Sequence, residues 1–161
     1  MDQGFEADFS GAKEFGRLLG VANPTIDDIK SLALLEASGE LFYEELAAGA
    51  PNDAVKRLLA RNGQEEAAHA HRLKRVIKIL TGEEFNIPER ADNPYCVSSP
   101  VKPAVTKESL TSLVQAEVEG DKFYERWASA MTNVEAAKLL RQNGKEESRH
   151  GERLAEAIRL F

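Results

Sequence analysis

Two short glutamate–histidine patterns in this chain have the residue types and the spacing of metal ligands. Glu66 precedes His69 by three residues, and Glu147 precedes His150 by the same spacing. Residues three apart on a helix are neighbours on one face, so both side chains of a pair could reach a single ion. Two further glutamates stand alone, one ahead of each pair. Together they predict a carboxylate-bridged dinuclear metal site inside four helices. The six candidate ligands are Glu36, Glu66, His69, Glu117, Glu147 and His150.

All six candidates belong to a repeat with one fixed offset. Residues 36–44 match residues 117–125 at five of nine positions, and residues 62–73 match residues 143–154 at seven of twelve. In every case the second copy lies 81 residues after the first. One Glu-x-x-His pattern arises by chance in any Glu-rich helix, whereas two copies at the same offset as two further glutamates indicate a shared site.

The apolar neighbours of these glutamates predict that their side chains are buried. Glu147, for example, lies seven residues after Leu140 and seven before Leu154. A buried carboxylate without a partner is costly, so a metal is the expected compensation, and solvated surface glutamates are the alternative. Four carboxylates carry four negative charges, which two divalent ions balance. Oxygen and imidazole ligands suit two iron ions, with manganese or a mixed pair as alternatives and zinc as a redox-inert, adventitious occupant.

Four helices must position these residues. Thr25 and Asp28 give a capping pattern at the start of the first helix, and Asn133 caps the fourth. Pro51 suits the first turn of the second helix, and Gly82 ends it. The expected helices span residues 25–48, 51–80, 106–130 and 133–161.

A proline-rich crossover over residues 82–105 separates the second helix from the third, and no helix is expected in it. Fully extended it could reach ~80 Å, whereas the second helix is only ~45 Å long, so it can run the length of the bundle. The second and third helices are therefore parallel. This predicts an all-α, ferritin-like four-helix bundle over residues 25–161, with two pseudo-symmetric hairpins related by a two-fold axis. Residues 1–24 form an N-terminal segment with no assigned element.

Composition limits the classes of partner and the compartment. The net charge of −6 argues against nucleic acid and against an anionic membrane surface. No apolar run approaches the roughly 18 residues of a membrane span, and no secretory signal is recognisable. Cys96 is the single cysteine, which excludes an intrachain disulfide and a rubredoxin-type iron site within one copy. A cytoplasmic location is expected.

The residues around the two glutamate–histidine pairs resemble the diiron domain of rubrerythrin. Residues 66–73 are similar to its second-helix signature and residues 147–154 to its fourth-helix signature, and the resemblance covers roughly residues 26–160. It implies that Glu66 and Glu147 bridge two metals. It further implies that Glu36 and Glu117 are terminal ligands, with one histidine on each metal.

Two departures from that family bear on function. Rubrerythrins usually carry a further ligand glutamate where this chain has Gly120. The rubredoxin domain is also missing, so electrons are expected from another protein, such as a rubredoxin-like donor. The leading hypothesis is a homodimeric peroxidase or oxidase that reduces hydrogen peroxide or oxygen. An iron-oxidising, iron-handling protein and a helical protein with a purely structural metal site are the alternatives, and hairpin exchange between chains stays open.

Four residues near the candidate ligands, two tyrosines and two glycines, can each be interpreted in two ways. Tyr43 and Tyr124, the candidate catalytic residues, each lie seven residues after an isolated glutamate. Because tyrosines in helices lean toward the N-terminus, each hydroxyl could approach a ligand carboxylate; ordinary core tyrosines are the alternative. Gly39 and Gly120 could admit an oxidant to the site or allow close helix packing.

Two further glutamates directly precede the bridging candidates. With a two-fold arrangement, Glu65 should reach the ring nitrogen of His150, and Glu146 that of His69. The alternative is that both lie at the surface, where His71 is also expected.

Overall fold

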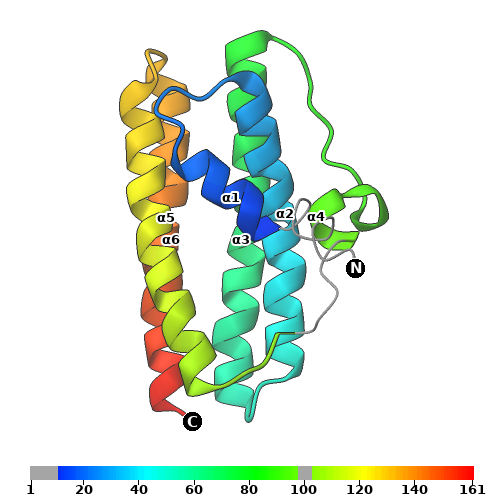
Figure 1. Ribbon diagram of the computed structural model, residues 1–161, viewed down its shortest axis with the longest axis vertical. Helices are drawn as coiled ribbons and strands as arrows, with labels where there is room; N and C mark the ends of the chain where they lie inside the picture. The colour runs from blue at the N-terminus through cyan, green and yellow to red at the C-terminus, as the bar shows by residue number, and fades with distance from the viewer. Residues whose placement is uncertain (1–10, 98–102) are drawn as a thin grey trace, which may run out of the picture.

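Four long helices make up the body of the protein (Figure 1). The computed structural model describes residues 11–97 and 103–161, and within them it contains helices and no strand. The all-α four-helix bundle predicted from sequence is therefore confirmed. The helices are α1 (Gly11–Leu19), α2 (Ile26–Ala48), α3 (Asp53–Thr81), α4 (Pro94–Val97), α5 (Lys107–Ala130) and α6 (Val134–Arg159).

The long helices form two antiparallel hairpins, α2–α3 and α5–α6. The described part of the crossover lies beside the bundle, and α3 and α5 run in the same direction, as predicted (Figure 1). The hairpins meet chiefly where α3 packs against α6. No described helix is both long and apolar enough to cross a membrane.

Capping side chains set the starts of the long helices. Thr25 and Asp28 form the expected capping box, with the Asp28 backbone N–H donating to Thr25 Oγ1 at 3.1 Å. The predicted role of Pro51 is wrong, because α3 begins after Asn52, whose side chain accepts from the Val55 N–H at 2.9 Å. Gly82 ends α3 with a positive φ of 77°, a conformation that glycine adopts without a Cβ clash.

Two short helical segments lie where the sequence predicted none. The crossover contains a 3₁₀ turn, Arg90–Asp92, followed by α4. Pro94 occupies the first position of α4, where a missing N–H costs nothing. Asn93 is buried and donates from Nδ2 to the Leu34 carbonyl at 2.9 Å, which fastens the crossover to α2.

Helix α1 in the N-terminal segment bridges the two hairpins (Figure 1). Arg17 pairs with Asp28 of α2 at 3.0 Å, and Phe15 lies 5.5 Å from Phe123 of α5, between ring centroids. Leu18 is fully buried. Residues 1–10 lie outside the described residues.

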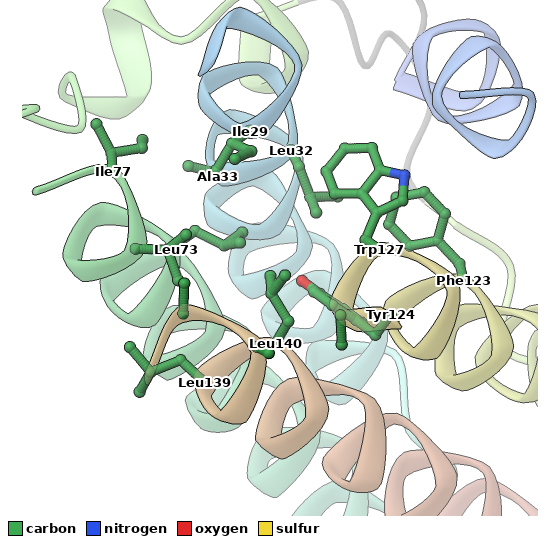
Figure 2. Packing of buried hydrophobic residues seen from close by; sticks show 14 of the residues in the cluster. Ile29, Leu32, Ala33, Leu73, Ile77, Phe123, Tyr124, Trp127, Leu139 and Leu140 are labelled. Atoms are coloured by element: carbon green, nitrogen blue, oxygen red, sulfur yellow. The ribbon is translucent and has the colours of Figure 1, made fainter. Parts of the chain in front are cut away.

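Two hydrophobic clusters occupy the two ends of the bundle. One contains Trp127, Phe123 and Tyr124 of α5 packed against Leu32 and Leu73 (Figure 2). The other lies around Tyr43, Leu46, Leu59 and Leu154. The candidate ligands lie in the polar layer between these clusters, so apolar packing seals the site from both ends.

Candidate metal centre

The structure brings all six candidate ligands into one buried layer. Glu36 comes from α2 and Glu117 from α5, while α3 and α6 each supply one glutamate–histidine pair. Both histidines are fully buried, and the four glutamates are 6–9% exposed. Each of the four carboxylates lies near the middle of its helix.

These side chains form two groups of four that share two members. One group contains Glu36 and His69, and the other contains Glu117 and His150. Glu66 and Glu147 belong to both. Within each group, one oxygen or nitrogen per residue lies within 4.8 Å of the others. Two adjacent ions that share bridging carboxylates need this arrangement of donors.

The histidine Nδ1 atoms point into the layer of carboxylates. His69 Nδ1 lies 3.5 Å from oxygens of Glu66 and Glu147, and His150 Nδ1 lies 3.4 and 3.3 Å from oxygens of the same two residues. Both Nδ1 atoms and Glu147 Oε2 are buried, with no hydrogen-bond partner among the described residues. Donor atoms that each lie about 2.0–2.2 Å from one ion are about 3–4 Å apart, so the set fits a dinuclear centre.

Each imidazole is held from behind by a glutamate of the opposite hairpin. His69 Nε2 donates to Glu146 at 3.0 Å, and His150 Nε2 donates to Glu65 at 3.1 Å. The predicted pairing is confirmed, and the surface alternative is wrong because both glutamates are buried. The bond holds a proton on Nε2, so Nδ1 is the ring nitrogen that faces the carboxylates and could bind a metal.

Two arginines, to which the sequence alone assigned no role, each bind both carboxylate oxygens of one of these glutamates. Arg72 donates to the two oxygens of Glu146 at 2.6 and 3.0 Å. Arg153 donates to the two oxygens of Glu65 at 2.8 and 3.0 Å. Each arginine also bonds a buried asparagine one hairpin away, Asn143 and Asn62 respectively, at 3.0 Å. The available signal was repetition, because these residues recur at the same offset of 81 as the candidate ligands.

The two candidate catalytic tyrosines reach carboxylates of the hairpin opposite their own. Tyr43 of α2 donates to Glu117 of α5, and Tyr124 of α5 donates to Glu36 of α2. Burial raises the pKa of both hydroxyls, and the neighbouring glutamates raise it further. The hydroxyls therefore remain protonated donors at neutral pH.

Glycines in the middle of α3 and α6 give the tyrosines their room. A Cβ on Gly63 would lie 3.1 Å from the Cβ of Tyr43, and a Cβ on Gly144 would lie 3.0 Å from that of Tyr124. Such contacts are tighter than most Cβ contacts in proteins, so a side chain at either glycine would require the tyrosine to shift. The glycines thus let the two helices of each hairpin approach closely beside the site.

Strong electrostatic coupling surrounds the candidate ligands. Burial opposes protonation of His150, but the carboxylates of Glu117, Glu147 and Glu66 outweigh it and raise the pKa of this imidazole to about 12. Burial, with the adjacent charge of Glu66, raises the pKa of Glu36 to about 8. Without a metal, the candidate ligands therefore hold protons at neutral pH, and bound cations could replace those protons.

A cavity of about 540 Å³ reaches the carboxylates between α2 and α5. A Cβ on Gly120 would meet Glu147 Cδ at an ordinary 3.5 Å, whereas one on Gly39 would lie 3.2 Å from Glu66 Cδ. Gly39 therefore permits close packing against one candidate bridging carboxylate, whereas at Gly120 the contact with the other would be an ordinary one. His71 lies away from this layer and is exposed, as expected.

Comparisons with known proteins point to one family. The family model described as Rubrerythrin matches residues 32–158, which include all six candidate ligands. Searches of curated proteins and of solved structures returned no match. With its helical bundle, its buried glutamate–histidine layer and a family match over most of its length, the chain belongs to the rubrerythrin family.

Proposed function

We propose that the protein is a dinuclear-metal redox enzyme that reduces hydrogen peroxide or oxygen, with a pair of iron ions as the first choice and manganese as the alternative. The observation that carries this proposal is the pair of buried donor groups sharing Glu66 and Glu147. Carboxylate and imidazole donors suit iron and manganese. A bound redox pair would supply two electrons to an O–O bond.

The chain's own residues would hold the centre and its protons in place. Glu66 and Glu147 would lie between the ions, with Glu36 and His69 on one side and Glu117 and His150 on the other. Glu65 and Glu146 keep each imidazole oriented through its Nε2–H. Tyr43 and Tyr124 hold a proton at each hydroxyl beside a terminal carboxylate.

Electrons would come from a separate donor protein, such as a rubredoxin-like partner. The single cysteine, Cys96, cannot build an iron–sulfur site within residues 1–161. The cavity that reaches the carboxylates favours a site where small molecules react over a purely structural one, since a structural site has no use for an open side.

Oxidation of the reduced protein tests this function. Iron-loaded protein is reduced chemically, freed of reductant and mixed with hydrogen peroxide while its absorbance is followed. We expect rapid oxidation by the wild type and none by Glu66→Ala, which removes a carboxylate shared by both donor groups. Glu152→Ala, an exposed change on α6, is the control and should react as the wild type does. Equal peroxide consumption by Glu66→Ala and the wild type would show that this site is not the catalyst.

A further inference from the structure

The cavity beside the carboxylates is larger than hydrogen peroxide or oxygen requires. Its volume of about 540 Å³ lies within the range of about 300–1,000 Å³ typical of small-molecule sites. Each of these oxidants has only two heavy atoms. The site therefore has room for a molecule that carries an organic group beside the reacting oxygens.

Apolar side chains from four helices form the walls of this cavity. They come from α1, α2, the short α4 and α5: Phe15, Leu35, Leu41, Phe42, Tyr95 and Ala116. At its inner end lie four carboxylates, those of Glu36, Glu66, Glu117 and Glu147. A wall of apolar groups ending at a few convergent polar ones is the usual construction of a small-molecule binding site.

The charges around the cavity argue against an anionic occupant, and its apolar walls favour an uncharged one. None of the described residues that line it is Lys or Arg, whereas Glu45 adds a fifth carboxylate to the lining. An anionic ligand would lie among like charges without a cationic partner, which is unfavourable in a partly buried site. A neutral molecule with an apolar body meets no such penalty.

Small residues on α5 create the room for this body. Position 116, which lies 81 residues after Leu35, carries an alanine instead of leucine. Gly120 lies one turn further along and, like Gly39 at the corresponding position of α2, contributes no side chain; the atoms nearest to a Cβ placed there belong to Glu147, from 3.5 Å. At the Leu35 and Ala116 positions, the α2 wall is therefore bulkier than the α5 wall.

We propose that the cavity binds a neutral organic hydroperoxide, with its apolar body between α2 and α5 and its peroxide group at the carboxylates. This substrate class rests on the proposed function for its chemistry. The O–O bond of ROOH breaks as two electrons and two protons arrive, and the products are the alcohol ROH and water. The electrons come from the external donor protein, through the dinuclear centre.

Binding of the product alcohol tests the cavity without any turnover. The full-length protein, as purified and oxidised, is titrated with 2-phenyl-2-propanol, the alcohol formed from cumene hydroperoxide, and binding is followed by calorimetry. We expect saturable binding that Ala116→Phe weakens by about tenfold or more, since the new ring fills the space between the helices. Ala60 of α3 is exposed, as Ala116 is, but does not line the cavity, so Ala60→Phe should bind as the wild type does. Absence of saturable binding, or equal weakening by both variants, would overturn the inference.

Single-turnover rates separate this inference from the proposed function. Reduced protein is mixed with cumene hydroperoxide or hydrogen peroxide. Ala116→Phe should lower the rate with cumene hydroperoxide relative to the rate with hydrogen peroxide by about tenfold, because only the first substrate has an organic group to exclude. Oxidation by hydrogen peroxide with no such selectivity would overturn the substrate class alone. Saturable alcohol binding without oxidation by either peroxide would overturn the proposed function, and the hydroperoxide assignment with it.

Discussion

Tyr43 donates a hydrogen bond to Glu117, and the bond joins the two hairpins across the candidate metal centre. Tyr124 forms the reciprocal bond to Glu36. Helices α2 and α5, which carry these four residues, flank the cavity and pack mainly against their own hairpin partners. The two phenol hydroxyls are thus direct links between these helices at the level of the carboxylates.

Replacing Tyr43 by Phe removes one link without changing the shape of the ring. We expect the free energy of unfolding to fall by about 1–3 kcal/mol, because the buried Glu117 carboxylate loses a hydrogen-bond donor. Urea unfolding measures the change. Tyr95→Phe is the control: this tyrosine is only half-buried, and its change should be about 0.5 kcal/mol or less. Equal losses in the two variants would show that the bond to Glu117 contributes nothing specific.

Glu146→Gln should weaken metal binding while the fold is retained. The amide keeps the shape of the carboxylate but accepts more weakly from His69 Nε2, and it loses the charge that Arg72 clamps. Metal affinity or activity should fall by about 10–100-fold, measured by competition with a chromophoric chelator. Glu135→Gln, an exposed residue of the same helix, should leave affinity unchanged. Equal metal affinities for the Glu146 and Glu135 variants would show that the hydrogen bond from His69 to Glu146 does not contribute to metal binding.

The glycine of α6 beside Tyr124 should not tolerate even a methyl group. Alanine is favoured over glycine in a helix interior by about 1 kcal/mol. At Gly144, however, the new Cβ would lie 3.0 Å from Asp121 Oδ1 and from Tyr124 Cβ, so overpacking should cost about 1–3 kcal/mol. Gly16→Ala in α1 is the matched control, because nothing lies within 4 Å of its Cβ. Chemical unfolding should show destabilisation by the first change and stabilisation by the second; stabilisation by both would refute the packing role of Gly144.

Metal binding should strengthen as the pH rises. In the protein without metal the pKa of Glu36 is raised to about 8 and that of His150 to about 12, so both groups hold protons at pH 7. An ion that takes their place must displace those protons. Affinity should therefore fall by about tenfold per pH unit for each proton displaced as the pH is lowered. Calorimetry in two buffers of different ionisation enthalpy counts the protons released, and a count of zero would contradict the assignment of these groups as ligands.

Features fixed by spacing along one helix were predictable from the sequence. The three-residue interval places Glu66 and His69 on one face of α3. The candidate ligands lie near the middle of their helices, so they meet in one layer. Thr25 and Gly82 set helix ends through local backbone chemistry, and both were correctly predicted.

Features that depend on how the hairpins meet could not be predicted this way. The sequence indicated that Tyr43 faces the site, but only the packing of α2 beside α5 determines that it bonds Glu117. Arg72 has a long side chain, and its bond to Glu146 depends on how α3 packs against α6. Helix α1 depends on tertiary contacts such as the burial of Leu18, which a nine-residue segment does not reveal by itself.

Nearly every bond that completes the centre runs from one hairpin to the other. The bonds of His69 with Glu146, of His150 with Glu65 and of both tyrosines all do so. Neither hairpin alone contains a complete centre, so the crossover acts as a tether that sets the effective concentration of one half for the other. A bound metal pair would latch the halves together, and exchange of hairpins between two chains would preserve every one of these bonds.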